Sequence, residues 1–238
     1  MKKLFLILVL AIPIGVLAFT VPAQAITLTL ELDTPFGTKP SPDGVAPWLR
    51  ATFDDDDSFG SVTLTLEARL EVEDNFIKEV YFNFYTDSFD VNKLHFGTPT
   101  TNADVTAPAI SFGVDSFKAD GDGLYDILLA FEQNDKKKED LYRFDDFDTL
   151  VFTITSSEAI TANSFDFYST YDGGEGVWKA VAKVQGLLDV PEGEDDSTWI
   201  GPSDGFKPVP EPATVLLLGT GLIGLAAVGR RKKFRRSS

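Results

Sequence analysis

Residues 62–72 alternate strictly between apolar and polar side chains. Residues 26–32 repeat the same period of two, with Ile or Leu at every second position. Because successive side chains of a β-strand point to opposite faces, this period predicts strands with one buried and one solvated face. A sheet of such strands needs a second apolar layer to cover its buried face. The alternation therefore favours two packed sheets.

Seven further short segments have the composition of strands, and no segment of ten or more residues between them shows a helical stripe. These segments are residues 48–53, 79–85, 109–117, 125–131, 150–155, 164–169 and 177–185. Many short strands with turn-rich connections predict an all-β fold, an antiparallel β-sandwich of jelly-roll type. The chain has no cysteine, so its core must hold it together, and its 20 Phe residues can supply that core.

Two connections between the strands have distinctive compositions. Residues 48–53 and 61–68 flank an acidic segment that contains Asp54, Asp55, Asp56 and Asp57, which predicts a hairpin with a solvated acidic tip. Residues 33–47 are rich in Pro and Gly and predict a long loop.

The N-terminal segment has the pattern of a secretory signal peptide. Two lysines precede an apolar run over residues 4–19, and Ala23 and Ala25 supply small residues at the two positions that a signal peptidase requires. We therefore expect residues 1–25 to be removed by a cut before Ile26. An uncleaved N-terminal anchor is the alternative.

The C-terminal segment has the pattern of a short membrane anchor. Residues 213–228 carry no charge, and as a helix they would extend about 24 Å, slightly less than a hydrocarbon core of about 30 Å. A basic cluster follows and predicts a cytoplasmic end, with the preceding chain outside the inner membrane. The cluster consists of Arg230, Arg231, Lys232, Lys233, Arg235 and Arg236.

Pro210, Glu211 and Pro212, the apolar span and the basic end together resemble the PEP-CTERM sorting signal of bacterial exported proteins. The resemblance is confined to this C-terminal segment. It implies that an exosortase recognises the Pro-Glu-Pro motif and cuts near it, which would release the exported part from the membrane. It also implies an association with exopolysaccharide and biofilm production.

These patterns divide the chain into four regions, and the exported part is strongly acidic. The regions are the signal peptide 1–25, a β-sandwich domain 26–188, an acidic Pro/Gly-rich stalk 189–208 and the sorting signal 209–238. The full chain has a formal net charge of −16, and both predicted processing steps remove basic residues. Such a charge opposes binding to nucleic acid or to anionic membranes, and it leaves extracellular polysaccharide as a possible partner.

The residues that could carry chemistry are few. His95 is the sole histidine, and without cysteine it cannot build an HExxH zinc site or a cysteine-based active site. No GxSxG motif supports a serine nucleophile, so we interpret His95 as an exposed bystander in a loop. The sequence thus predicts a non-enzymatic protein.

The segment that begins at Asp120 resembles the first half of a calcium loop. Asp120, Asp122 and Asp126 could offer carboxylate oxygens, the ligands that calcium prefers. Leu124 and Phe131 stand where an EF-hand needs an aspartate and a glutamate. The alternative is therefore a tight Asp-Gly turn before the strand, with no cofactor.

Three classes of function remain open. The first is a structural or interaction protein of the cell surface or extracellular matrix. The second is a carbohydrate-binding module, with or without calcium, in which exposed aromatic residues stack on sugars; the third is a secreted hydrolase with paired carboxylates. We expect most of the aromatic candidates to be core or rim residues of the sandwich; they are Tyr168, Tyr171, Trp178 and Trp199.

Overall fold

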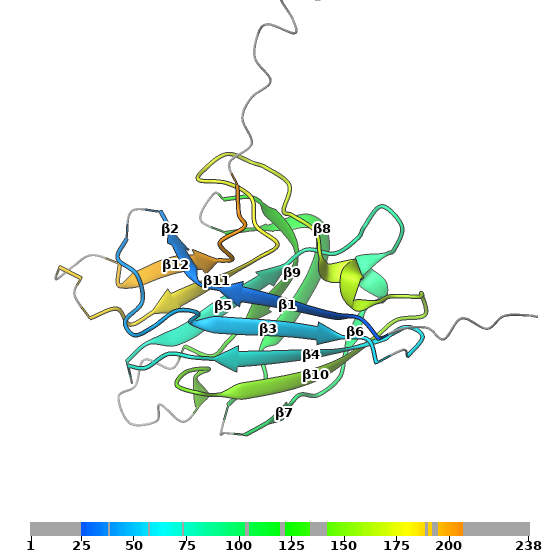
Figure 1. The fold of residues 1–238 in the computed structure, drawn as a ribbon, viewed down its shortest axis with the longest axis horizontal. Helices are drawn as coiled ribbons and strands as arrows, with labels where there is room; N and C mark the ends of the chain where they lie inside the picture. The colour runs from blue at the N-terminus through cyan, green and yellow to red at the C-terminus, as the bar shows by residue number, and fades with distance from the viewer. Residues whose placement is uncertain are drawn as a thin grey trace, which may run out of the picture.

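Two antiparallel sheets make up the fold in the computed structural model of the chain (Figure 1). The model describes residues 25–37, 39–56, 58–72, 74–102, 105–119, 122–133, 142–188, 190–191 and 195–206.

The first sheet has the order β1-β3-β4-β10-β6, and β7 also pairs with β10. Its central hairpin joins β3 to β4, as predicted from the sequence, and its register places Phe53 opposite Leu64. The strands are β1 (Thr27–Leu32), β3 (Leu49–Asp54), β4 (Ser61–Ala68), β6 (His95–Phe96), β7 (Thr100–Thr101) and β10 (Thr149–Thr155).

The second sheet has the order β2-β12-β11-β5-β9-β8. The 3-10 helices η1 (Val91–Lys93) and η3 (Ala162–Phe165) lie between strands in the described part of the chain. The strands of this sheet are β2 (Thr34–Phe36), β5 (Phe76–Phe82), β8 (Ala109–Lys118), β9 (Leu124–Ala130), β11 (Ala180–Gln185) and β12 (Ser197–Gly201).

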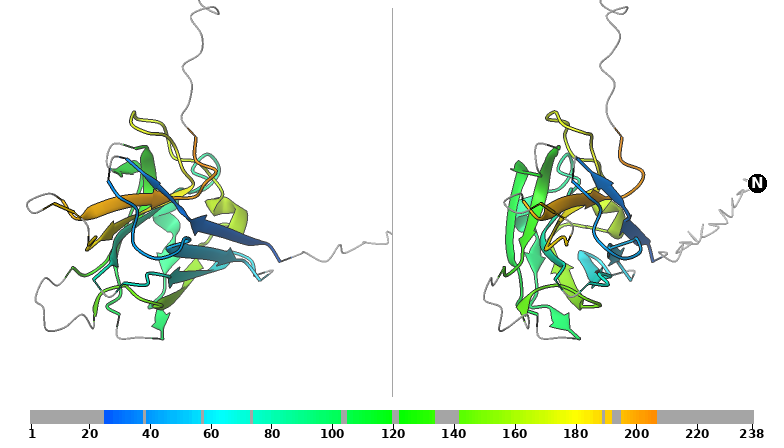
Figure 2. Two further views of the ribbon diagram at one scale, coloured as in Figure 1. Left: turned by 60° about the vertical axis from the view of Figure 1, so that its left-hand side comes forward. Right: turned by 90° about the vertical axis from the view of Figure 1, so that its left-hand side faces the viewer.

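The sheets form the predicted antiparallel β-sandwich, and Figure 2 shows the two layers from the side. The chain passes repeatedly between the layers, so β4 lies beside β10 in one sheet and β5 lies beside β11 in the other. In both sheets, strands that are far apart in the sequence therefore pair with each other. The finer jelly-roll assignment stays a prediction.

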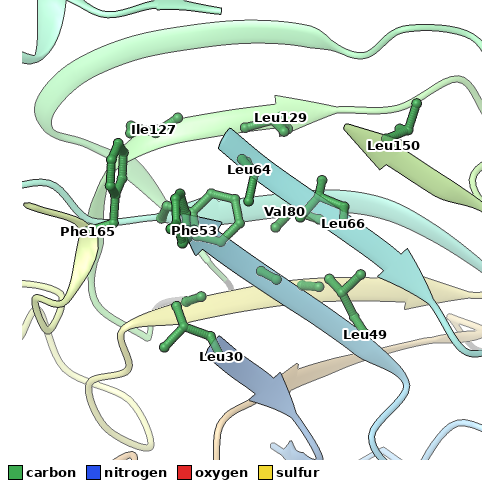
Figure 3. Close-up of a cluster of buried hydrophobic side chains, with 14 of the residues drawn as sticks. Leu30, Leu49, Phe53, Leu64, Leu66, Val80, Ile127, Leu129, Leu150 and Phe165 are labelled. Atoms are coloured by element: carbon green, nitrogen blue, oxygen red, sulfur yellow. The ribbon is translucent and has the colours of Figure 1, made fainter. Parts of the chain in front are cut away.

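The main core lies between the two sheets, where the alternating residues of β4 turn their apolar side inward. Leu64 and Leu66 are fully buried, and Val80 and Ile127 meet them from the second sheet (Figure 3). Phe53 stacks on the Phe165 ring of η3, with the ring centroids 4.4 Å apart. The predicted Phe-rich core is thus present, and it includes a helix as well as strands.

A second apolar cluster covers part of the opposite face of the second sheet. Tyr81 and Val181 are paired neighbours that alternate with Val80 and Ala182 of the main core, so they point to the other side. The cluster consists of Phe36, Tyr81, Ala119, Tyr125, Trp178, Val181 and Trp199. Strands β5 and β11 are therefore apolar on both faces, whereas we expected one core.

The predicted stalk 189–208 needs a correction. Residues Ser197–Gly201 form β12, which is buried along its whole length and pairs with both β11 and β2. Trp199 faces the second cluster while Ile200 faces the main core. A strand buried on both faces shows no alternation of apolar and polar residues. Because β12 is short and the residues around it are acidic and rich in Gly, the sequence does not predict it as a strand.

Two other segments also differ from the expected structure. The predicted loop 33–47 contains the three-residue strand β2, which pairs with β12. The predicted strand 164–169 instead begins inside η3. There the Ser164 hydroxyl accepts a hydrogen bond from the Thr161 N–H at 3.0 Å, a local contact that favours a helical turn over a strand.

Both predicted targeting segments lie largely outside the described residues. Residues 1–24, including Ala23, and residues 207–238, including Pro210, Glu211, Pro212 and the basic cluster, belong to this part. Ala25 is described and exposed. Among the described residues, no helix is long and apolar enough to cross a membrane.

The two phenylalanines near the β3–β4 hairpin should respond very differently to truncation. Phe53 is fully buried, whereas Phe59 at the hairpin tip is 80% exposed. We expect Phe53→Ala to lower the free energy of unfolding by about 3–5 kcal/mol, because it leaves a cavity in the main core. Phe59→Ala should change it by about 0.5 kcal/mol or less. Denaturant unfolding followed by tryptophan fluorescence measures both, and equal losses would contradict this assignment of the core.

Candidate functional site

A groove runs along the free edge of β1. Its volume is about 390 Å³, within the range of sites that bind small ligands. One wall is β1 and the residue after it, and the other is formed by Lys179 and the chain that leaves β12. The lining residues are Leu28, Thr29, Leu30, Glu31, Asp33, Lys179, Pro202, Ser203 and Asp204.

Strand β1 presents unpaired backbone groups to this groove. Among the described strands it pairs with β3 alone, and the Asp55 N–H donates to the Ile26 carbonyl at 3.2 Å. Backbone groups of an antiparallel ladder alternate in direction, so those of Thr29 and Glu31 point away from β3. Beyond β1, the Asp33 N–H donates to the Gly201 carbonyl at 3.1 Å. The first sheet is thus linked to the second at this end of the groove.

Lys179 links the groove to two carboxylates and an aromatic ring. Its Nζ lies 2.8 Å from Asp166 Oδ1 and 3.2 Å from Asp204 Oδ2. It also lies 5.2 Å from the centroid of the Tyr168 ring, and the Tyr168 hydroxyl donates to Asp204 Oδ2 at 3.2 Å. The hydrogen bond to Asp166 is the largest cause that raises the pKa of Lys179. We call Lys179, Asp166, Asp204 and Tyr168 the Lys179 network.

The local fold holds the Lys179 network in place. Lys179 directly precedes β11, and its neighbour Trp178 is buried against Phe36, with ring centroids 4.1 Å apart. The Val177 N–H donates to the Phe206 carbonyl at 2.9 Å, and the Phe206 N–H donates back at 3.1 Å. Phe206 also packs edge-on against Tyr168. The second cluster therefore positions the Lys179 ammonium group. The backbone bridge between Val177 and Phe206 places Phe206 against the Tyr168 ring.

The arrangement suits recognition of a polar, largely uncharged ligand. The groove offers backbone donors and acceptors from β1, carboxylate oxygens and one ammonium group. The partly exposed Tyr168 contacts the groove residues Lys179 and Asp204, and Phe206 packs against Tyr168. Hydroxyl groups of a sugar can both donate to carboxylates and accept from an ammonium, and its C–H faces can pack on aromatic rings.

Asp126 and Asp122, which we predicted as calcium ligands, both accept hydrogen bonds from the backbone. Asp126 is buried; its Oδ2 accepts from the Phe84 N–H at 2.9 Å and its Oδ1 from the Asp115 N–H at 2.8 Å. Burial is the main cause that raises the pKa of Asp126. Asp122 is also buried, and its Oδ1 accepts from the Glu175 N–H. These contacts give both carboxylates a role in holding loops.

The predicted calcium site lies only partly within the described residues. Among them, no three His, Asp or Glu side chains are grouped closely enough to hold a metal ion. Asp120, the first residue of the predicted site, lies outside the described part of the chain. The calcium site stays a prediction.

The other polar residues singled out from the sequence occupy varied positions. His95 is exposed, but it belongs to the short strand β6 and not to a loop. The predicted solvated tip is wrong at Asp55, which is buried and accepts two backbone hydrogen bonds. Asp57 lies outside the described residues. Adjacent carboxylates in one acidic run thus differ because the chain turns Asp55 inward.

The aromatic candidates for sugar stacking divide into two pairs. Tyr168 and Tyr171 are 39% and 42% exposed, whereas Trp178 and Trp199 are 6% and 8% exposed and belong to the second cluster. Of these four, in the part of the chain that the structure describes, it is Tyr168 that contacts groove residues, through a hydrogen bond to Asp204 and a cation–ring contact with Lys179. The two tryptophans are therefore core residues, as expected for most of the four.

Sequence reasoning missed the other members of the Lys179 network. Asp166, Lys179 and Asp204 are separated by 13 and 25 residues in an acidic chain, and no motif connects them. Residues 202–204 belong to the predicted stalk. If residues 197–201 were recognised as a strand, Asp204 could be placed just after that strand and next to the groove.

Comparison with known proteins identifies the C-terminal segment. The family model for the PEP-CTERM protein-sorting motif matches residues 208–232. No curated protein and no solved structure matches the chain. The match confirms the sorting signal predicted at Pro210, Glu211 and Pro212, which implies export, anchoring in the membrane by the C-terminal segment, and processing by an exosortase.

Replacing Lys179 should weaken the fold in a manner that depends on pH. Lys179→Met removes the cation between Asp166 and Asp204, and we expect a loss of about 1 kcal/mol at neutral pH. A raised lysine pKa means that this stabilisation is complete below the unfolded pKa of about 10.4 and is lost as pH rises through the folded pKa. The difference between wild type and variant should therefore shrink above about pH 10.4.

Lys118→Met is the matched control, because Lys118 forms an exposed ion pair with Asp172. It should change the free energy of unfolding by less than about 0.5 kcal/mol. Urea unfolding at neutral pH and at about pH 11 measures both variants. A Lys179→Met loss no larger than that of the control would contradict the network's role.

Proposed function

We propose that this exosortase-sorted exported chain is a non-enzymatic protein of the cell surface or extracellular matrix. It acts through structural or binding contacts in association with exopolysaccharide and biofilm. The sorting motif at residues 208–232 carries the proposal, because it directs the β-sandwich to the outside of the inner membrane.

The use of the buried carboxylates supports a non-enzymatic role. A general acid in a glycosidase needs an oxygen that faces the substrate. Asp126 and Asp148 have a raised pKa because of burial, yet Asp126 accepts two backbone hydrogen bonds and Asp148 accepts one from the Asp145 N–H at 3.0 Å. Neither lines the groove. Their environments fit loop fixation better than acid catalysis.

The groove along β1 favours a second candidate function, carbohydrate binding. It combines carboxylates, an ammonium group and unpaired backbone groups with the neighbouring ring of Tyr168. A neutral polysaccharide is the chemistry that suits this set, because an acidic polymer would meet Glu31, Asp33 and Asp204 along the walls. Such binding would attach the protein directly to the polysaccharide of the matrix.

The first test concerns processing at the C-terminus. In the producing cells, the mature protein should lack the segment that ends at Ser238. The Glu211→Ala variant should keep this segment and stay in the membrane fraction. Cell fractionation with mass spectrometry of the C-terminal peptide measures both. Glu175→Ala, a change on the exposed surface of the sandwich, is the control and should be processed normally. An intact Ser238 in the mature surface protein would refute processing.

The second test concerns polysaccharide binding. The processed protein should sediment with exopolysaccharide isolated from the same cells, and Tyr168→Ala and Asp204→Asn should each weaken binding about tenfold, the factor that 1.4 kcal/mol represents. Tyr171→Ala is the matched control, because Tyr171 is similarly exposed, whereas among the described contacts it is Tyr168 that touches the groove residues Lys179 and Asp204.

Melting curves of the three variants show whether each one is folded. Equal binding by Tyr168→Ala, Asp204→Asn and the control would exclude the groove as the binding site. If the wild-type protein sediments with no polysaccharide, the carbohydrate-binding candidate is wrong, while the structural role remains open to the processing test.

A further inference from the structure

The start of β1 is held by a buried carboxylate. Asp55 is 5% exposed, and its Oδ1 accepts a hydrogen bond from the Ile26 N–H at 2.8 Å. Its Oδ2 accepts from the Ala162 N–H at 3.3 Å, and its own N–H donates to the Ile26 carbonyl at 3.2 Å. One side chain thus joins β1, the β3–β4 turn and the first residue of η3.

This carboxylate has no cation beside it in the described part of the chain. The ion pairs found there involve Glu31, Glu67, Asp166, Asp172 and other acidic residues, but not Asp55. A carboxylate that leaves water loses a large hydration energy, which hydrogen bonds from neutral N–H groups offset only in part. A positive charge at this position would offset more of that cost.

Ile26 is also the residue that the signal-peptide pattern places first in the mature chain. Ala25 is exposed, and the Ala25–Ile26 bond lies next to a strand end and not within a strand. Hydrolysis of that bond adds one water molecule, leaves a carboxylate on Ala25 and an amine on Ile26, and keeps the Ile26 nitrogen on its Cα. An α-amino group has a typical pKa of about 7.7–8.0, so below that range it takes up a proton.

We propose that cleavage before Ile26 creates an ion pair between its new α-ammonium group and the buried Asp55 carboxylate. The nitrogen already lies 2.8 Å from Oδ1, so the pair forms without a rearrangement of the strand. A hydrogen bond from a charged donor to a charged acceptor is stronger than one from a neutral N–H. Removal of the signal peptide therefore stabilises the exported fold as well as freeing it.

The contact also bears on the groove. Strand β1 is an edge strand held by β3 on one side, and it forms one wall of the groove. Fastening its first residue to Asp55 and, through Ala162, to η3 restrains that wall at its N-terminal end. The proposal rests on the predicted cleavage before Ile26 and is independent of any ligand.

Two forms of the protein that differ only at the N-terminus test the ion pair. One begins at Ile26 and the other at Ala23, and both continue to Ser238 in mild detergent. The form that begins at Ile26 should have an equilibrium constant for folding about tenfold larger, because it alone carries the ammonium group opposite Asp55. In the Asp55→Asn background the two forms should be equally stable, since the amide has no charge to pair. Denaturant unfolding followed by tryptophan fluorescence measures all four proteins.

Asp56→Asn is the matched control, because it removes a neighbouring exposed carboxylate of the same acidic run and should leave the tenfold difference in place. If Asp55→Asn does not fold, selective acetylation of the Ile26 α-amine provides a second route. The acetyl group removes the charge but keeps an N–H, so it should reduce the stability to that of the form beginning at Ala23.

Three results would overturn the proposal. The first is equal stability of the Ile26 and Ala23 forms with Asp55 present. The second is a difference that persists unchanged in Asp55→Asn or after acetylation. The third is an N-terminal residue other than Ile26 in the mature protein purified from its producing cells.

Discussion

The contact between the apolar faces of the two sheets is the interaction on which the rest of the structure depends. Without cysteine, the exported chain has no disulfide to hold its layers together. Leu64 and Leu66 face Val80 and Ile127 across the core, and Phe53 meets Phe82 edge-on with ring centroids 5.2 Å apart. Hydrophobic burial of this kind fixes both the register and the separation of the sheets.

A second apolar cluster packs on the other face of the second sheet and positions residues at the surface. The cluster around Trp178 and Trp199 covers the opposite face of β11 and β12 and sets the place of Lys179. Buried carboxylates then fasten the connections, as Asp126 does for the backbone at Phe84 and Asp115. Part of the acidic composition therefore serves the fold.

The position of the two chain ends agrees with export and processing. Ile26 directly precedes β1, and Phe206 is the last described residue, held by its bridge to Val177. The sorting motif begins two residues later, at residue 208. Cuts before Ile26 and near Pro210 would therefore leave every described strand intact. The groove lies between these two ends, along β1 and the chain that follows β12.

The sequence by itself determined the local and the targeting features. The period of two in residues 26–32 and 62–72 predicted β1 and β4, because the alternation of side chains is a property of the strand itself, although β4 ends at Ala68 and residues 69–72 lie outside it. The Pro-Glu-Pro motif with its apolar span and basic end specified the sorting signal, because a processing enzyme recognises it as linear sequence.

Only the tertiary structure decided the rest. Strand β12 needed β2 and β11 on its two sides, so its five residues gave no pattern that local reasoning could recognise. Asp55 and Ala162 are 107 residues apart, and Asp166, Lys179 and Asp204 meet only because β11 and the chain after β12 are placed together. Long-range pairing and burial determine such contacts, and neither is encoded in the spacing of residues along the chain.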